Sequence, residues 1–109
     1  MPVVKNEKVR RWIRSPGNRM HEFRAIVSGR VQMVMFRDFT CRKARKVRVT
    51  GFVRNLPDGT VEAVAQGARE NLEKLIEYLH TGSILSHVEH IAVEWRVPQK
   101  TFDSFDLIY

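Results

Sequence analysis

Residues 49–65 read VTGFVRNLPDGTVEAVA, and this stretch decides the fold class. Its centre is the pair Asp58-Gly59, which lies between two short runs of β-branched and alternating residues. An Asp-Gly pair between such runs is a strong hairpin signal, because glycine accepts the positive φ that tight turns need. We therefore predict a strand at 49–54, a turn that ends at Gly59, and a returning strand at 61–65.

A helix is expected on each side of this hairpin. Residues 36–47 repeat apolar side chains every three to four positions and carry a basic outer face. Residues 68–80 carry an apolar stripe at positions i, i+3, i+4 and i+7, and Gly82 follows as a stop signal. Both patterns have the period of an amphipathic α-helix.

Alternating apolar residues predict further strands at 22–28, 88–97 and 105–109. The resulting order is β-α-β-β-α-β with a last short strand, which is the ferredoxin-like plan. We therefore predict an α/β fold (an α+β sandwich). It has a mostly antiparallel sheet of four to five strands and two helices on one face.

The net charge of +7 is unevenly distributed along the 109 residues. A basic protein first indicates a polyanionic partner such as nucleic acid. Residues 1–20, however, hold six basic residues and one acidic residue, so most of the excess belongs to this segment. We predict a basic N-terminal extension at 1–20, flexible or folded into a short helix, with Met20 as a plausible natural start. A single domain is expected at 21–109.

Several classes of protein are excluded by what the chain lacks. It has no apolar run of about 18–20 residues and no signal-peptide pattern, so we expect a cytoplasmic protein without membrane association. It has no Walker loop, HExxH or CxxC motif. His87 and His90 are interpreted as surface histidines, and Cys41 as a tolerated free cysteine off the apolar stripe of the first helix. No metal is expected.

The junction between the first strand and the first helix, residues 29–37, is the candidate site. A loop that enters a helix N-terminus presents unpaired backbone N–H groups and the positive end of the helix dipole. Arg37, in the first helical turn, adds a guanidinium that is suited to a phosphate. A junction of this kind is common, so by itself it is weak support for a site.

The complete set of motifs is more specific. GRVQxVxFR occupies residues 29–37, GFVRN occupies 51–55 and DGxVE occupies 58–62. These strings, at this separation, resemble the acylphosphatase family, and the similarity extends over residues 22–109.

The resemblance implies an enzyme that hydrolyses the carboxyl-phosphate bond of acyl phosphates without a metal or organic cofactor. Its partner would be a small acyl phosphate, and a monomer is expected. Arg37 would bind the phosphoryl group, and Asn55 would position the attacking water. The remaining phosphate ligands would be the backbone N–H groups of Gln32, Met33, Val34, Met35 and Phe36.

These roles also make chemical sense for an acyl phosphate. The leaving group is a carboxylate whose conjugate acid has a pKa of about 4, so little general-acid assistance is needed. Catalysis then consists mainly of holding the anion and aligning water. Asn55 is neutral, so it can hold a water molecule without repelling the phosphate.

Two residues depart from the family pattern. Met33 stands where the family usually has a glycine in the phosphate loop, and it accepts backbone strain or changes the loop's shape. Arg48 replaces a glycine that is usual at the end of the first helix. Met35 occupies a position that varies in the motif. Two interpretations stay open: an active enzyme, or a catalytically weakened relative that binds or regulates.

An RRM-like nucleic-acid-binding module is the alternative from another class, because it has the same topology. Such modules carry aromatic residues in a K/R-G-F/Y-x-F-V-x-F/Y string on the central strands. The nearest string here, Gly51-Phe52-Val53, lacks the trailing aromatic residue. The sequence therefore argues against nucleic acid as the primary partner.

Overall fold

The computed structural model describes residues 20–109. The predicted extension, apart from Met20, therefore lies outside the described residues. The elements follow the predicted order, and their bounds are β1 (His21–Arg30), α1 (Phe36–Lys46), β2 (Thr50–Asn55), β3 (Val61–Gly67), α2 (Arg69–Thr81), β4 (His87–Arg96) and β5 (Phe105–Ile108).

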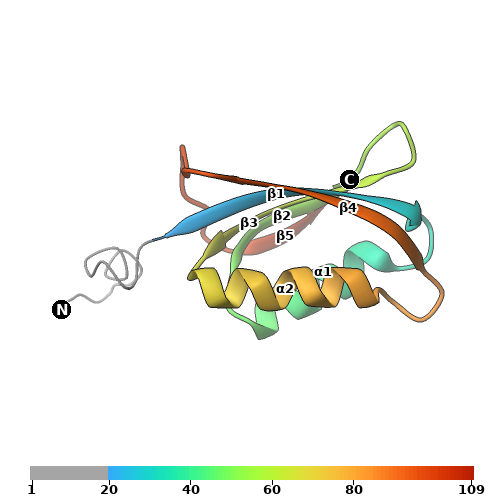
Figure 1. The fold of residues 1–109 in the computed structure, drawn as a ribbon, viewed down its shortest axis with the longest axis horizontal. Helices are drawn as coiled ribbons and strands as arrows, with labels where there is room; N and C mark the ends of the chain where they lie inside the picture. Colours follow the sequence, from blue (N-terminus) through green and yellow to red (C-terminus); the bar gives the residue numbers. More distant parts are fainter. Residues whose placement is uncertain (1–19) are drawn as a thin grey trace.

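The strands form one sheet in the order β4-β1-β3-β2-β5. All neighbouring pairs are antiparallel except β2 and β5, which are parallel. Both helices cover the same face of the sheet (Figure 1), so the ferredoxin-like prediction is confirmed. This topology makes β1, β2 and β5 point the same way, and their carboxyl ends meet at one edge of the sheet.

The β2–β3 hairpin forms where Asp58-Gly59 predicted it. The N–H of Leu56 donates to the carbonyl of Thr60 at 2.9 Å, and Gly59 adopts a φ of 93°. The Asp58 carboxylate accepts from the N–H of Thr60 at 3.0 Å, which closes the turn locally. The hairpin thus fixes the register of the two central strands and the position at which β2 ends.

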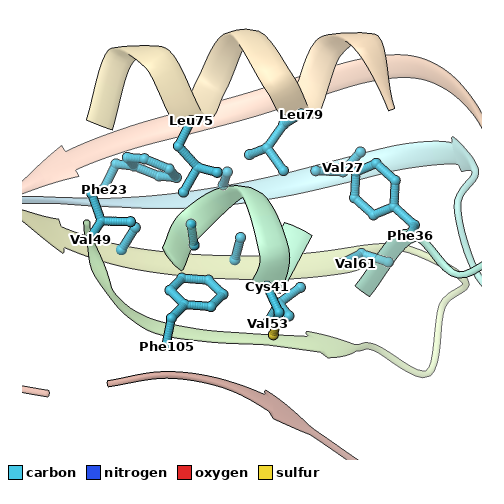
Figure 2. Packing of buried hydrophobic residues seen from close by; sticks show 14 of the residues in the cluster. Phe23, Val27, Phe36, Cys41, Val49, Val53, Val61, Leu75, Leu79 and Phe105 are labelled. Atoms are coloured by element: carbon cyan, nitrogen blue, oxygen red, sulfur yellow. The ribbon is translucent and has the colours of Figure 1, made fainter. Parts of the chain in front are cut away.

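The hydrophobic core lies between the sheet and the two helices. β1 contributes Phe23 and Val27, and α2 contributes Leu75 and Leu79, all fully buried (Figure 2). These are the positions that the alternation in β1 and the apolar stripe in α2 predicted. The core therefore follows directly from the two sequence periods, two in strands and about 3.6 in helices.

The prediction that Cys41 lies off the buried face of α1 is wrong. Its side chain is 3% exposed and belongs to the core cluster with Val53 and Phe105 (Figure 2). The reason is that α1 packs on β5 as well as on β2, so a wider part of the helix surface is covered. Burial raises the pKa of the Cys41 thiol, which stays protonated and serves as a small apolar side chain.

The central strand β3 also buries a carboxylate, on the face of the sheet opposite the helices. Glu62 accepts hydrogen bonds from Arg24 at 2.6 Å and from Arg54 at 2.5 Å, and its side chain is 5% exposed. Burial by itself raises the pKa of Glu62, but the two guanidinium groups outweigh it and the pKa is lowered. Glu62 therefore joins the neighbouring strands β1 and β2 through charge.

A lowered pKa in the folded state makes Glu62 a source of acid sensitivity. Its contribution is present above the pKa of an unfolded glutamate and is lost as the pH falls through the folded value. We expect Glu62→Gln to lower the free energy of unfolding by about 1–2 kcal/mol near neutral pH, and by much less near pH 3. Urea unfolding at both pH values measures the two differences.

The exposed pair Arg69–Glu73, joined at 3.1 Å, supplies a control for this experiment. Glu73→Gln removes the same charge from a side chain that is 57% exposed, and it should change stability little at either pH. An equal loss for Glu62→Gln at both pH values would contradict the assignment.

Candidate active site

The pairing of β1 with β4 is irregular near the end of β1, where Gly29 lies. The pairing of β1 with β4 shifts register between Ser28 and Gly29, and Gly29 has a φ of 125°. A Cβ atom there would lie 2.1 Å from the carbonyl oxygen of His87, so only glycine fits. β1 remains paired with β4 through Arg30, and the loop that precedes α1 begins after it.

The loop that follows presents a row of free backbone amides. Within residues 20–109, the N–H groups of residues 32–36 donate no hydrogen bond. Met35 is the N-cap of α1 with φ 62° and ψ 22°, and no side chain in the described part of the chain caps the helix. Most helices cap these amides with Ser, Thr, Asp or Asn. Here the first turn and its positive dipole are left open to an anion.

Three side-chain hydrogen bonds fix this loop in place. The Gln32 amide nitrogen donates to the carbonyls of Leu56 and Thr60 at 2.8 and 2.9 Å, and the Ser83 hydroxyl donates to the carbonyl of Val34 at 2.9 Å. The loop is therefore attached to the β2–β3 hairpin on one side and to the segment after α2 on the other. The motifs predict a role for the backbone N–H of Gln32 only, and nothing in the sequence around Ser83 indicates a contact with the loop.

Met33 and Met35 both adopt left-handed backbone conformations, with φ of 61° and 62°. Of the two outcomes foreseen for Met33, the structure shows the strained backbone. Met35 occupies a position that varies in the motif, and its backbone carries the same strain as that of Met33. Arg48 also has a positive φ, 63°, as expected of a residue that replaces a helix-ending glycine.

Replacing Met33 by glycine is therefore expected to stabilise the protein. Met33 is 98% exposed, so almost no apolar burial is lost. Relief of the left-handed conformation outweighs the extra entropy of glycine in the unfolded chain, for a net gain of up to about 1 kcal/mol. Urea unfolding measures it. Ile84→Gly is the matched control, because Ile84 is equally exposed and has no positive φ; a similar loss of stability in both variants would contradict the prediction.

Arg37 lies beside the free amides and is held from β5. One guanidinium nitrogen donates to the carbonyl of Ile108 at 3.1 Å, and the guanidinium carbon lies 5.0 Å from the centre of the Tyr109 ring. Among the described residues, no other group accepts a hydrogen bond from Arg37. The rest of its donors remain for a ligand. The contribution of β5 and Tyr109 was not foreseen.

Asn55 lies at the end of β2, at the same end of the sheet as the loop after β1. The strands β1 and β2 are not neighbours, because β3 lies between them. The two residues that flank Asn55 connect it to the site. Arg54 pairs with Ile108, whose carbonyl accepts a hydrogen bond from Arg37. The carbonyl of Leu56 accepts a hydrogen bond from the Gln32 side chain. In Figure 1 the β1–α1 loop, the hairpin and the end of β5 lie together at the right-hand end.

The Asn55 side chain is unusual in its hydrogen bonding. Its Oδ1 atom is buried, and it has no hydrogen-bond partner among the described residues. Asn55 alternates with Val53, so it lies on the helix-facing side of β2, the side on which α1 begins. A buried acceptor without a partner costs about 1–3 kcal/mol, which points to a ligand or a water molecule as its partner.

A surface hollow of about 530 Å³ lies over the start of α1. Arg37 and the side chains of Met33 and Met35 line it, whereas Asn55 does not. Asp38 is the acidic residue of the first turn, and Arg42 pairs with it at 3.1 Å. The site therefore combines free backbone amides, Arg37 and the apolar side chains of Met33 and Met35, and the Asp38 carboxylate is already paired.

The described part of the chain contains no group of three or more His, Cys, Asp or Glu residues that could hold a metal ion. His87 and His90 are exposed on β4. No helix among residues 20–109 is long and apolar enough to cross a membrane.

Fold and site together define a ferredoxin-like sandwich whose first strand-to-helix loop carries free amides beside an arginine. The family is given by comparison with known proteins, since the family model "Acylphosphatase" matches residues 23–107. The chain belongs to the acylphosphatase family.

Individual relatives agree with this assignment. An acylphosphatase of Methanococcoides burtonii is 48% identical over 79 residues, which are 72% of this chain and 82% of that protein. An acylphosphatase of Chloroflexus aurantiacus is 42% identical over 91 residues, 84% of this chain and 96% of that protein. The crystal structure of acylphosphatase from Bacillus subtilis superposes with a TM-score of 0.79 at 36% identity, covering 82% of this chain and 99% of the other.

Proposed function

We propose that this chain is an acylphosphatase that hydrolyses the carboxyl-phosphate bond of acyl phosphates. One observation carries the proposal. At the N-terminus of α1, the backbone N–H groups of residues 32–36 and most donors of Arg37 lie close together, and among the described residues they have no acceptor. Such a set of fixed donors suits the oxygens of a phosphoryl group. Membership of the acylphosphatase family supports the same conclusion.

In the proposed reaction the phosphoryl oxygens accept hydrogen bonds from the loop amides and from Arg37. These donors are preorganised by Gln32 and Ser83, so they stabilise the charge that spreads over the oxygens in the transition state without reorganising. The buried Oδ1 of Asn55 accepts a hydrogen bond from the attacking water. Water oxygen bonds to phosphorus, the acyl carboxylate leaves with the bonding electrons, and the proton of water passes to phosphate and solvent.

The proposal extends to the rest of the expected properties. No step needs a metal or organic cofactor, because a carboxylate leaves readily without protonation. We infer a monomeric domain at 21–109 with a separate basic segment at 1–20. A cytoplasmic location is consistent with Cys41, a free and buried thiol.

Hydrolysis of benzoyl phosphate by the full chain tests the function. We expect turnover that is unaffected by EDTA and competitively inhibited by inorganic phosphate. Absence of turnover above the uncatalysed rate would refute the enzyme and favour the weakened binding or regulatory relative; phosphate binding by calorimetry would then distinguish a surviving anion site from none. A salt-dependent gel shift by residues 21–109 would instead favour the nucleic-acid alternative.

A further inference from the structure

A second pocket lies at the other end of α1, away from the loop that precedes this helix. Its volume is about 410 Å³, and residues at the end of α1, just after it and on α2 line it. We call it the basic pocket, and its lining residues are Lys46, Val47, Arg48, Asn71, Lys74 and Tyr78. Because the 11 residues of α1 each rise about 1.5 Å, roughly 16 Å separates the two ends of the helix. The proposed reaction makes no use of this pocket.

The charged side chains of the basic pocket all have the same sign. Lys46, Arg48 and Lys74 line it, and no carboxylate within residues 20–109 does so. None of the ion pairs in that part of the chain involves these three side chains. In contrast, Arg42 and Arg45 on α1 both donate hydrogen bonds to acceptors of the chain itself. The cations of the basic pocket are therefore available to an anion from outside.

Helix stability explains only part of this cluster. A basic residue in the last turn of a helix, such as Lys46, interacts favourably with the helix dipole. Lys74 lies in the middle of α2 and forms an ion pair with neither Glu70 nor Glu77, which lie one turn away. Arg48 adopts a left-handed backbone with a φ of 63°, which is unfavourable for any residue that has a Cβ atom. Strain of this kind concentrates at binding sites, so Arg48 and Lys74 indicate one.

Two neutral polar side chains complete the donor set of the basic pocket. Asn71 and Tyr78 are half-buried there, and both side chains can donate hydrogen bonds. The ammonium groups of Lys43 and Lys46 lie 4.7 and 5.8 Å from the centre of the Tyr78 ring, an arrangement that restrains both cations at this end of α1. Phosphate oxygens accept hydrogen bonds from all of these donors. A water molecule fills about 30 Å³, so the pocket has room for several phosphate groups.

We propose that the basic pocket binds a chain of linked phosphate groups, either free as inorganic polyphosphate or attached to a nucleoside. Three cations without a carboxylate favour a ligand with more negative charge than orthophosphate, which carries about two charges. Val47 is the one aliphatic side chain of the lining, so the pocket offers little of the apolar surface by which grooves hold peptides. The pocket is thus a second anion site, at the opposite end of α1 from Arg37.

Calorimetry with sodium tripolyphosphate and the full chain tests this site. All variants are made in an Arg37→Gln background, which weakens anion binding at the proposed catalytic site, and all contain the same basic residues at 1–19. We expect tripolyphosphate to bind at least about tenfold more tightly than orthophosphate, and more weakly as the salt concentration rises. Adenosine triphosphate distinguishes the two sources. A nucleoside that adds nothing to the affinity favours the free chain, one that tightens binding favours a nucleotide, and both results support the site.

Variants of the lining locate the bound ligand. Lys74→Gln and Arg48→Gly should each weaken tripolyphosphate binding by about three- to tenfold, and the double variant should weaken it further. Arg48→Gly should also raise the midpoint of urea unfolding, because glycine accepts the left-handed conformation, so its loss of binding would not come from unfolding. Lys74→Gln carries the test by itself if Arg48→Gly proves unstable. Arg42→Gln is the matched control, since it removes the same charge from α1 but Arg42 does not line the basic pocket.

Three results would overturn the basic pocket as a ligand site. Equal losses in Arg42→Gln and in the pocket variants would show general attraction to a basic chain. Unchanged binding in the pocket variants would place tripolyphosphate elsewhere on the protein. Absence of binding in the Arg37→Gln background would leave the proposed catalytic site as the one anion site. None of these results concerns the turnover of benzoyl phosphate, so the proposed function would stand or fall separately.

Discussion

Arg37→Gln is expected to reduce kcat/KM for benzoyl phosphate by about 1,000-fold or more, the range seen when a cation or an oxyanion donor is removed from a phosphoryl or acyl transfer site. The reason is that, among residues 20–109, Arg37 is the one cation lining the hollow and most of its donors have no acceptor. Inhibition by inorganic phosphate should weaken in parallel, because the same donors bind the ground-state anion. Steady-state kinetics with and without phosphate measure both effects.

Arg42→Gln is the matched control for Arg37→Gln. Arg42 lies on the same helix and its loss changes the net charge by the same amount, but its partner is Asp38 and it does not line the hollow. We expect activity within about twofold of wild type, which separates contact with the phosphate from long-range attraction. Arg37→Lys should recover little, because an ammonium group lacks the planar fork. Equal losses in Arg37→Gln and Arg42→Gln would refute the assigned role.

Asn55→Ala is expected to lower kcat by about 100- to 1,000-fold while the inhibition constant of phosphate changes little. This split follows from the proposed role, in which Asn55 touches the water and not the phosphoryl group. Stability should respond in the opposite direction from activity. The buried Oδ1 has no partner among the described residues, so its removal should leave the free energy of unfolding unchanged or raise it by up to about 1 kcal/mol.

Asn55→Asp provides the second variant at this position. It keeps the size of the side chain and the acceptor, but it places a negative charge beside the phosphate, so we expect phosphate inhibition to weaken as well as kcat to fall. Urea unfolding and kinetics of both variants complete the test. A destabilised Asn55→Ala protein with kcat near the wild-type value would show that Asn55 is structural, and would overturn its proposed role.

The two strained methionines lie in the loop that carries the free amides, directly before Arg37. Left-handed backbone at Met33 and Met35 costs stability that glycine would restore. The strain persists because Gln32 and Ser83 hold the loop from both sides. Strained segments of this kind concentrate at binding sites, where the surrounding structure determines them.

The sequence by itself determined the elements and their faces. Alternation identified β1, the stripe at positions i, i+3, i+4 and i+7 identified α2, and Asp58-Gly59 identified the hairpin, because each of these signals lies within a few neighbouring residues. The candidate residues Arg37 and Asn55 were also chosen from sequence, through motifs that resemble a family. Local patterns and family motifs can both be read from the sequence without knowing which segments of the chain are in contact.

Only the tertiary structure decided how these parts meet. It separated β1 from β2 by β3, buried Cys41 in the core, and brought the Ile108 carbonyl to Arg37 across 71 positions of sequence. It also tied Gln32 to the hairpin and Ser83 to the loop. Each of these contacts joins segments that are distant in sequence, and its formation depends on the packing of the whole sheet and both helices. Local sequence patterns do not show which distant segments are in contact, so only the fold gave the geometry of the site.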